Sequence, residues 1–285
     1  MSAEGELVRI DDTSLFVVER GAGHPVIVLH GGPGLDHHEF ADYLDPLTDE
    51  FRLLLVDQRA NGRSERPTES TWTLERMAQD VIMLARALRL ERYAVLGHSY
   101  GAFVALQNAV DYPGMAAQTI VSSGIPSMRF LAAVEANLNA FEPVELREQV
   151  IASWAREADV RTAEEFAQLM VDQFPFHFAD PLDPRIDDYL ERTSGTVYAP
   201  DMLRVSSASG YGGIEVEDRL GEITQPVLVL TGRHDRTCTV AAAEATAAGI
   251  SNAELRILEH SGHMTFVEEP DLYVALVRSF LERTT

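Results

Sequence analysis

The stretch Gly97–Gly101, read Gly-His-Ser-Tyr-Gly, constrains the fold of this chain more than any other. A short apolar run, Tyr93–Leu96, precedes it, and helix-forming residues follow from Ala102. A serine between two glycines where a strand meets a helix is typical of a tight turn, because a side chain at either glycine would collide with neighbouring backbone. N–H groups at the start of the helix would favour negative charge near the serine oxygen. The pattern therefore predicts a strand–turn–helix unit that carries Ser99 as a nucleophile.

Short apolar runs alternate with helical patterns over most of the chain, as a mostly parallel sheet covered by helices requires. The expected strands are Leu7–Ile10, Ser14–Glu19, Pro25–Leu29, Phe51–Val56, Tyr93–Leu96, Gln118–Val121, Pro226–Leu230 and Glu254–Leu258. Besides the helix after Ser99, the expected helices around them are Leu74–Leu90 with Thr73 as N-cap, Val240–Ala248 and Pro270–Leu281. We therefore expect an α/β fold with an eight-stranded sheet, whose first two strands form a hairpin.

The pattern changes between residues 125 and 216, where strand-like runs vanish. The helical patterns in this stretch are Met128–Phe141, Val144–Ala158, Thr162–Phe174, Arg185–Thr193 and Pro200–Ser207. We expect a core domain of residues 1–124 and 217–285, and a helical cap domain of residues 125–216 above the active site. The aromatic cluster Phe174, Phe176 and Phe178 would either contact the substrate or attach the cap to the core.

A serine hydroxyl becomes a good nucleophile only when a base takes its proton, and a third group must orient that base. After a turn of this type the chain order is serine, acid, histidine. Asp235 follows the expected strand Pro226–Leu230, and His263 follows the last expected strand. His260 is an alternative base, but the Gly-His pair before an apolar run favours His263. Ser99, Asp235 and His263 are therefore the candidate catalytic residues.

Acyl transfer also needs two N–H groups that stabilise an oxyanion. The residue after the nucleophile, Tyr100, would supply one of them. The second would come from the glycine-rich segment 30–34, His-Gly-Gly-Pro-Gly, whose backbone can approach a ligand closely. Gly32 is the preferred donor and Gly31 the alternative.

The remaining histidines and the one cysteine do not suggest further chemistry. We expect the His98 side chain to face away from Ser99, His234 to pack or face solvent, and His37 and His38 to be exposed in a loop. No H-x-x-x-H pair or cysteine cluster indicates a metal site. Cys238 has no neighbouring base in the sequence, so we expect a buried, inert thiol.

The composition restricts the partners. A net charge of -22 argues against nucleic acids and anionic membrane surfaces, which would both be repelled. No apolar run approaches the ~20 residues of a membrane span, and the acidic first residues do not resemble a secretory signal. We expect a cytoplasmic enzyme that needs no cofactor and acts on a small molecule or short peptide. The sequence leaves the oligomeric state open.

Several motifs together resemble the prolyl aminopeptidase (proline iminopeptidase) family of α/β-hydrolases. They are HGGPG at 30–34, Asp57-Gln58-Arg59 with Asn61-Gly62-Arg63-Ser64, GHSYG at 97–101, GRHD at 232–235 and Gly262-His263 followed by Glu268-Glu269-Pro270. The resemblance implies that Ser99, Asp235 and His263 are nucleophile, acid and base, and that Gly32 and Tyr100 line the oxyanion hole. It also implies that segment 57–64 braces the HGGPG turn.

The family's way of binding a substrate amine is not evident in this chain. Members bind the free N-terminal amine with cap glutamates, in some cases helped by an acid after the triad aspartate. Here Arg236 stands at that position and would repel an ammonium group if it faced the pocket. Segment Ser206–Ile214, which replaces a family cap motif, has no carboxylate. The cap glutamates that could substitute are Glu142, Glu145, Glu215 and Glu217.

These observations favour a serine hydrolase that cleaves a small ester, lactone or amide through an acyl-enzyme. Release of N-terminal proline from peptides is the first alternative. A cofactor-free oxygenase or lyase, or a ligand receptor on the same fold, is an alternative of another class.

Overall fold

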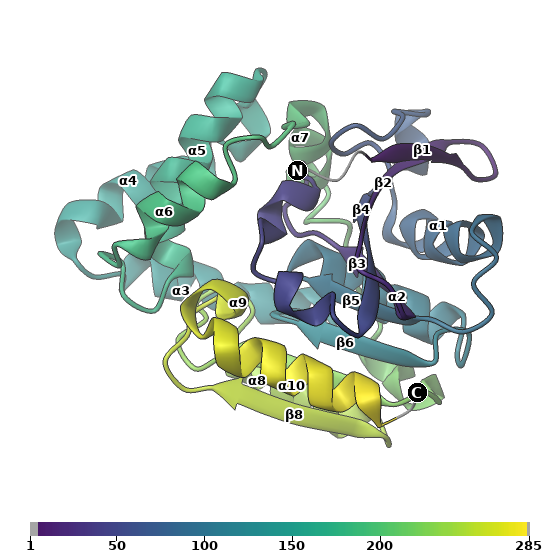
Figure 1. Ribbon diagram of the computed structural model, residues 1–285. Coiled ribbons are helices and arrows are strands. Elements are labelled where there is room, and N and C mark those ends of the chain that lie inside the picture. The colour runs from purple at the N-terminus through teal and green to yellow at the C-terminus, as the bar shows by residue number, and fades with distance from the viewer. Residues whose placement is uncertain (1–4, 284–285) are drawn as a thin grey trace.

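The computed structural model describes residues 5–283. Its eight-stranded sheet has the order β1-β2-β4-β3-β5-β6-β7-β8 (Figure 1). The strands β1 and β2 form an antiparallel hairpin, β2 pairs antiparallel with β4, and all other neighbours are parallel. The bounds are β1 Glu6–Arg9, β2 Ser14–Arg20, β3 His24–Leu29, β4 Phe51–Asp57, β5 Ala94–His98, β6 Gln118–Ser122, β7 Val227–Gly232 and β8 Ala253–Leu258. The predicted α/β class and the mostly parallel eight-stranded sheet are confirmed.

Helices cover both faces of the sheet, so its central strands are apolar throughout. Ile27 and Leu29 of β3 pack in one core with α1 (Leu74–Ala87), α2 (Tyr100–Asp111) and α8 (Val240–Gly249). Val26 and Val28 of the same strand pack in a second core on the other face. That core contains α10 (Pro270–Glu282), α9 (Thr265–Glu268) and the short 3₁₀ helices η1 (His37–Phe40) and η2 (Asp45–Leu47).

The helical insertion, residues 125–216, lies between β6 and β7 and extends beyond one end of the sheet (Figure 1). It contains η4 (Met128–Leu131), α3 (Ala132–Asn139), α4 (Val144–Ala155), η5 (Glu157–Asp159), α5 (Ala163–His177), α6 (Arg185–Arg192) and α7 (Pro200–Ala208). A single β-bridge between Ser127 and Glu215 joins its two ends. Two further 3₁₀ helices, η3 (Glu69–Thr71) and η6 (Glu217–Glu222), belong to the rest of the chain.

Several helix ends differ from the sequence prediction, among them those of α5 and α1. Helix α5 continues through Pro175 to His177 instead of ending at Phe174. A proline near the end of a helix removes only one hydrogen bond, and its fixed φ is compatible with the helix. Helix α1 ends at Ala87, three residues earlier than predicted, while its predicted N-cap is confirmed: the Thr73 side chain accepts the N–H of Arg76. Among the helices of residues 5–283, none has the length and apolar character needed to cross a membrane.

Candidate active site

Ser99 occupies a strained turn between β5 and α2, at φ 52° and ψ -117°. A Cβ atom on Gly97 would overlap the carbonyl oxygen of Gly101, and one on Gly101 would overlap that of Leu29. Both glycines are therefore required by the close approach of three backbone segments. The strained conformation presents the serine at the end of the sheet, as the sequence predicted for this turn.

Gly32 and Tyr100, the two predicted oxyanion donors, line the same cavity as Ser99. Tyr100 is the first residue of α2, so its N–H has no acceptor within the helix. Gly32, at φ 104°, lines the same cavity as Ser99 and Tyr100. Gly31 does not line the cavity, and its N–H is already donated to Glu39 Oε2 at 2.5 Å. This geometry favours Gly32 over the alternative donor Gly31.

The segment 57–64 braces the glycine-rich turn, as predicted. Asn61 Oδ1 accepts the N–H of Gly34 at 2.7 Å, and Gln58 Nε2 donates to the carbonyl of His30 at 2.7 Å. The Gln58 N–H also donates to His30 Nε2 at 3.1 Å. Because these bonds tie both ends of the turn to one loop, the turn is held rigidly beside Ser99.

Asp235 and His263 meet at the carboxyl ends of β7 and β8. His263 Nδ1 lies 2.8 Å from Asp235 Oδ2. The other carboxylate oxygen, Oδ1, accepts the N–H groups of Thr237 and Cys238, both at 2.9 Å, and the Thr237 hydroxyl at 2.8 Å. Burial alone would raise the pKa of Asp235, but the adjacent His263 and these hydrogen bonds lower it. Asp235 is therefore held as a carboxylate that fixes the orientation of the imidazole.

The backbone of His263 is held from two sides. Its N–H donates to the carbonyl of His177 in the helical insertion at 2.6 Å, and its carbonyl accepts the Ser123 hydroxyl at 3.0 Å. The insertion thus contacts the candidate base directly, and its position influences where the imidazole lies.

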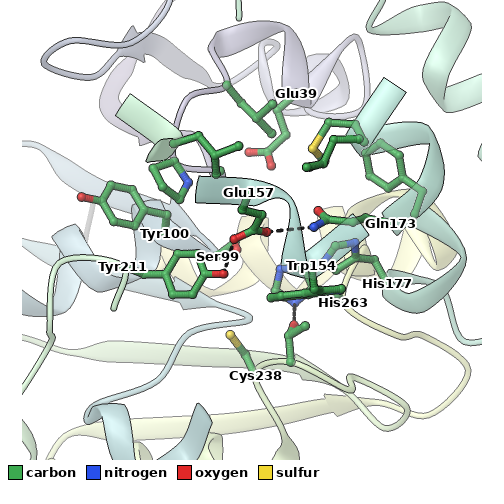
Figure 2. A pocket seen from close by; sticks show the side chains of 18 of the residues that line it. Glu39, Ser99, Tyr100, Trp154, Glu157, Gln173, His177, Tyr211, Cys238 and His263 are labelled. Carbon is green, nitrogen blue, oxygen red and sulfur yellow. Dashed lines mark hydrogen bonds between the residues drawn. The ribbon is translucent and has the colours of Figure 1, made fainter. Parts of the chain in front are cut away.

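Ser99 and His263 line one predominantly apolar cavity of about 100 Å³ (Figure 2). Besides Ser99 and His263, the core contributes Gly32, Pro33, Leu35, Glu39, Tyr100, Phe103, Thr237, Cys238 and Met264 to its wall. The insertion contributes Leu131, Trp154, Glu157, Phe166, Leu169, Met170, Gln173, Phe174, His177, Leu203 and Tyr211. A substrate that reaches Ser99 is therefore enclosed between the sheet and the insertion.

The predicted aromatic contacts are only partly found. Phe174 lines the cavity, but Phe176 and Phe178 do not, and both are fully buried elsewhere. Phe176 packs against the rings of Phe141 and Trp154, and Phe178 belongs to the second core. Residues three apart share a helix face, so α5 presents Phe174 and His177 to the cavity and turns Phe176 away.

Two buried glutamates in the cavity wall were not found by sequence reasoning. Glu157 accepts hydrogen bonds from the Tyr211 hydroxyl and from Gln173 Nε2, and burial raises its pKa. Burial likewise raises the pKa of Glu39, to about 8. Nothing in the sequence distinguishes Glu157 from the solvent-exposed glutamates of a helix. The only feature of the sequence that could have indicated Glu39 as a cavity residue is its position shortly after the glycine-rich turn.

The four glutamates considered from the sequence do not line this cavity. Glu142 pairs with Arg147, and Glu217 pairs with Arg129. Glu215 accepts the N–H of Met128, and Glu145 is exposed on α4. Glu215 and Glu217 lie at the end of the insertion that the β-bridge with Ser127 joins, and Glu142 and Glu145 lie at the start of α4. Neither part of the insertion lines the cavity.

Arg236 also does not face the cavity. Its guanidinium donates to the carbonyls of Phe176, Phe178 and Ala179 at 3.2, 2.5 and 3.1 Å. Arg236 therefore attaches the end of α5 to the loop that carries Asp235. Because its guanidinium does not face the cavity, it would not repel a substrate cation there. The neighbouring Cys238 lines the cavity, and burial raises the pKa of its thiol well above the usual value.

The prediction of two exposed loop histidines was wrong. His37 is buried, with Nδ1 2.6 Å from Asp57 Oδ1, and His38 is partly buried against Asp36. Asp36 and Asp57 hold the loop that follows the glycine-rich turn. Their hydrogen bonds keep the His37 and His38 side chains packed against the protein instead of extended into solvent. Asp36, His37 and His38 have possible ligand atoms within 4.8 Å of one another, but these internal hydrogen bonds already engage all three side chains.

His98, His234 and His260 do not line the cavity. The His98 ring is buried behind the turn, with its Nδ1 3.2 Å from Ser122 Oγ. It packs against the His263 ring at a centroid distance of 5.1 Å, and burial keeps its pKa well below the usual value. His234 and His260 are exposed.

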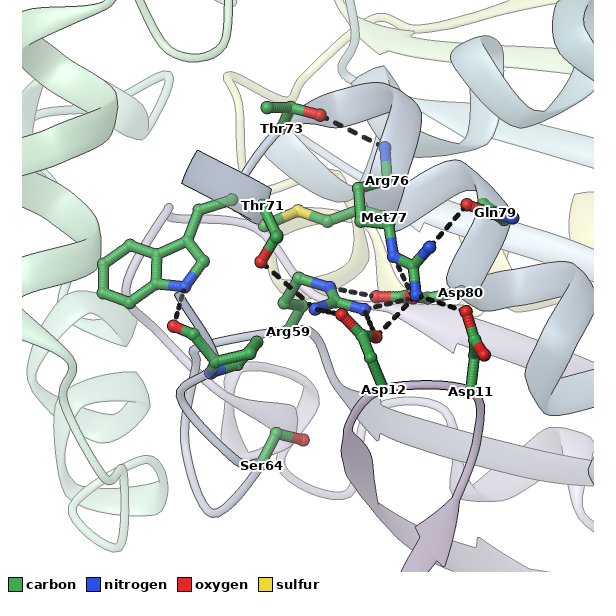
Figure 3. A network of polar contacts seen from close by, with 12 residues as sticks. Asp11, Asp12, Arg59, Ser64, Thr71, Thr73, Arg76, Met77, Gln79 and Asp80 are labelled. Carbon is green, nitrogen blue, oxygen red and sulfur yellow. Dashed lines mark hydrogen bonds and ion pairs between the residues drawn. The ribbon is translucent and has the colours of Figure 1, made fainter. Parts of the chain in front are cut away.

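Away from the cavity, a buried arginine joins the bracing loop to helix α1 (Figure 3). The Arg59 side chain is fully buried and donates two hydrogen bonds to Asp80, each of 2.7 Å. It also donates to Asp12 at 2.8 Å. The adjacent Arg59 lowers the pKa of Asp12 to about 2. The bidentate geometry indicates a structural anchor.

Replacing Arg59 by methionine should lower the free energy of unfolding by about 3 kcal/mol, because buried Asp80 would lose both short hydrogen bonds and keep only its 3.6 Å ion pair with Arg76. Urea denaturation at pH 7 measures this loss. Arg9→Met, which breaks an exposed pair with Glu65, is the matched control and should change stability little. Adding Asp80→Leu to Arg59→Met should restore part of the stability. An unchanged denaturation midpoint in Arg59→Met would contradict the anchor role.

Comparison with known proteins supports the fold and a hydrolase activity. The model of the alpha/beta hydrolase fold family matches residues 24–270. The chain belongs to the α/β-hydrolase family. A proline iminopeptidase of Heyndrickxia coagulans is 29% identical over 271 residues, which cover 92% of each chain. The chain is therefore a hydrolytic enzyme, similar to the prolyl aminopeptidases.

Solved structures of other hydrolases show the same architecture. The proline iminopeptidase of Mycobacterium smegmatis is 25% identical, with a TM-score of 0.77 over 99% of this hydrolase and 98% of that chain. An alpha/beta fold family hydrolase from Bacillus anthracis str. Sterne is 20% identical, with a TM-score of 0.81 over 97% of this hydrolase and 98% of that chain. The second likeness concerns the fold alone.

Proposed function

We propose that this hydrolase uses Ser99 as a nucleophile on an acyl carbon, with His263 as general base and Asp235 as its orienting acid. The observation that carries the proposal is the Asp235–His263 hydrogen bond beside a cavity that Ser99 also lines. His263 takes the Ser99 proton as the new C–O bond forms, and then gives it to the leaving group. Water next attacks the acyl-enzyme by the same route and releases the acid.

The N–H groups of Gly32 and Tyr100 hold the oxyanion in each tetrahedral intermediate. Each such donor typically stabilises the transition state by ~3 kcal/mol. We also propose that residues 125–216 act as a cap domain. This proposal is supported by the observation that they supply half of the residues in the cavity wall. The cap excludes water and selects the acyl group.

The substrate best suited to this cavity is a small ester, lactone or amide. The wall around Ser99 is mostly apolar, and Arg236 faces away from it. The cavity of about 100 Å³ has room for a short acyl group. A neutral, compact acyl group therefore fits both the polarity and the size of the site.

Release of N-terminal proline is the second candidate. The proline iminopeptidases named above support it. Two buried glutamates in the cavity wall, Glu39 and Glu157, also support it, and so does the orientation of Arg236 away from the cavity. An ionised glutamate there would attract a substrate ammonium group. Both candidates use the same nucleophile and differ only in the group that the cap recognises.

A pair of chromogenic substrates separates the two candidates. We expect kcat/KM for p-nitrophenyl butyrate to exceed that for proline p-nitroanilide at pH 7, and a fluorophosphonate probe to label Ser99 rapidly. A preference for the proline anilide that disappears in Glu157→Gln would favour the aminopeptidase instead. Absence of labelling would favour an oxygenase, a lyase or a receptor on this fold.

A further inference from the structure

Glu39 is a buried carboxyl group beside Ser99 that the proposed mechanism does not use. It lies in η1, directly after the glycine-rich turn, and its side chain lines the cavity (Figure 2). Its Oε2 accepts the N–H of Gly31 at 2.5 Å. A Cβ atom placed on Gly31 would lie 2.6 Å from Glu39 Oε1 and 3.0 Å from Ser99 Cβ. The second carboxyl oxygen and Ser99 Cβ therefore lie on either side of one point beside Gly31, and both Glu39 and Ser99 line the cavity.

No positive charge faces this carboxyl group among the described residues of the cavity wall, which include no arginine. The charge of Asp36 opposes ionisation of Glu39. The Tyr189 hydroxyl donates to the Glu39 backbone carbonyl at 3.0 Å and not to its carboxyl group. The other titratable groups around it are Tyr273 on α10, and His263, Tyr100, Cys238, Glu157, Tyr211 and His177 in the cavity wall. Burial lowers the pKa of His177 to about 3, so this imidazole is neutral. The surroundings thus favour the protonated form of Glu39.

We propose that the Glu39 carboxylic acid is a substrate subsite that donates a hydrogen bond from Oε1 to an oxygen of the acyl group bound at Ser99. The proposal rests on the acyl-enzyme function proposed above. With Oε2 committed to Gly31, the O–H group is directed to the cavity. The neighbouring wall is formed by apolar side chains such as Pro33, Leu35 and Leu203. An isolated donor in such a wall selects substrates that can accept its hydrogen bond.

The preferred substrates are therefore acyl groups that carry an ether, hydroxyl or carbonyl oxygen close to the scissile carbonyl. An acyl group without such an oxygen would leave the buried O–H unpaired, which typically reduces the rate by about tenfold to a hundredfold. This specificity is distinct from recognition of an ammonium group, which would require the ionised carboxylate.

The subsite also predicts a dependence on pH. The pKa of Glu39 is raised from its usual 4.5 to about 8, so the donor is present below pH 8. As the pH rises through 8, the donor is lost and a negative charge appears beside the oxyanion. The preference for acceptor-bearing acyl groups should therefore decline above pH 8.

Phenyl methoxyacetate and phenyl butyrate test the proposal, because they differ only by an ether oxygen in place of one methylene group. The kcat/KM of each, divided by its rate of hydrolysis by hydroxide, is measured from pH 6 to 9.5. The ratio of the two values cancels any pH dependence that the catalytic step shares between the two substrates. We expect the wild type to prefer methoxyacetate by about tenfold or more at pH 7, and to lose this preference above pH 8.

Two substitutions of the same side chain sharpen the test. Glu39→Gln keeps an acceptor for Gly31 and an N–H donor for the substrate, but cannot ionise, so its preference should persist at pH 9.5. Glu39→Met has no donor and should show no preference at any pH. Glu157→Gln, which changes the other buried acid of the cavity, should retain the decline above pH 8.

The outcomes distinguish this proposal from the proposed function. If the fluorophosphonate probe does not label Ser99 in the wild type, the acyl-enzyme function itself fails. If labelling is normal but the wild type shows no preference at pH 7, the subsite proposal is overturned. The subsite proposal is also overturned if Glu39→Gln loses the preference for methoxyacetate at pH 7, or if its preference still declines above pH 8.

Discussion

Replacing Ser99 by alanine should lower kcat for p-nitrophenyl butyrate by roughly 10⁶-fold, because the variant has no hydroxyl to form the acyl-enzyme. The fold should be unchanged, since the backbone conformation at this position depends on Gly97 and Gly101 and not on the hydroxyl. Single-turnover kinetics and fluorophosphonate labelling measure the loss, and circular dichroism tests the fold.

Ser207→Ala is the matched control for this substitution. Its hydroxyl donates only to the carbonyl of Arg204 within α7, and Ser207 does not line the cavity. We expect wild-type rates in this variant. Retention of more than a few per cent of activity in Ser99→Ala, after contaminating esterases have been excluded, would remove serine catalysis from consideration.

Replacing Asp235 by asparagine should lower kcat by about 10⁴-fold. Asp235 Oδ1 accepts three hydrogen bonds, from the N–H groups of Thr237 and Cys238 and from the Thr237 hydroxyl. An asparagine would keep its carbonyl oxygen there and turn its NH₂ group toward His263 Nδ1. The imidazole would then hold its proton on Nε2 and could not accept the proton of Ser99.

The loss in Asp235→Asn should appear in kcat, with little change in KM, because the substituted group does not line the cavity. Asp201→Asn, which removes an exposed charge paired with Arg204, should leave both constants unchanged. A loss of less than tenfold in Asp235→Asn would show that the imidazole does not depend on this carboxylate.

Much of the fold could be predicted because its signals are local. Each buried strand is a short apolar run, since both faces of the sheet are covered, and each turn at its end carries glycines that close backbone contacts require. The chain order of Ser99, Asp235 and His263 follows from the strands that precede them. Their catalytic roles stay predictions until the substitutions above are measured.

The lining of the cavity could not be predicted in the same way. Phe174 and Phe176 are two residues apart in one helical pattern, yet one faces the cavity and the other packs against Phe141. Arg236 follows the triad aspartate, but its direction depends on three carbonyls at the end of α5. Such orientations depend on how the insertion packs onto the core, and no local pattern records that packing.

The sequence by itself determined the class of the fold, the strand-ending turns and the order of the reactive residues, because spacing and backbone sterics act over a few residues. Only the tertiary structure decided which acids enter the cavity. Glu39 and Glu157 are buried there, whereas Glu142 and Glu217 pair with surface arginines. The physical reason is that the burial of a carboxyl group, and with it its pKa and its chemistry, depends on contacts between segments far apart in the chain.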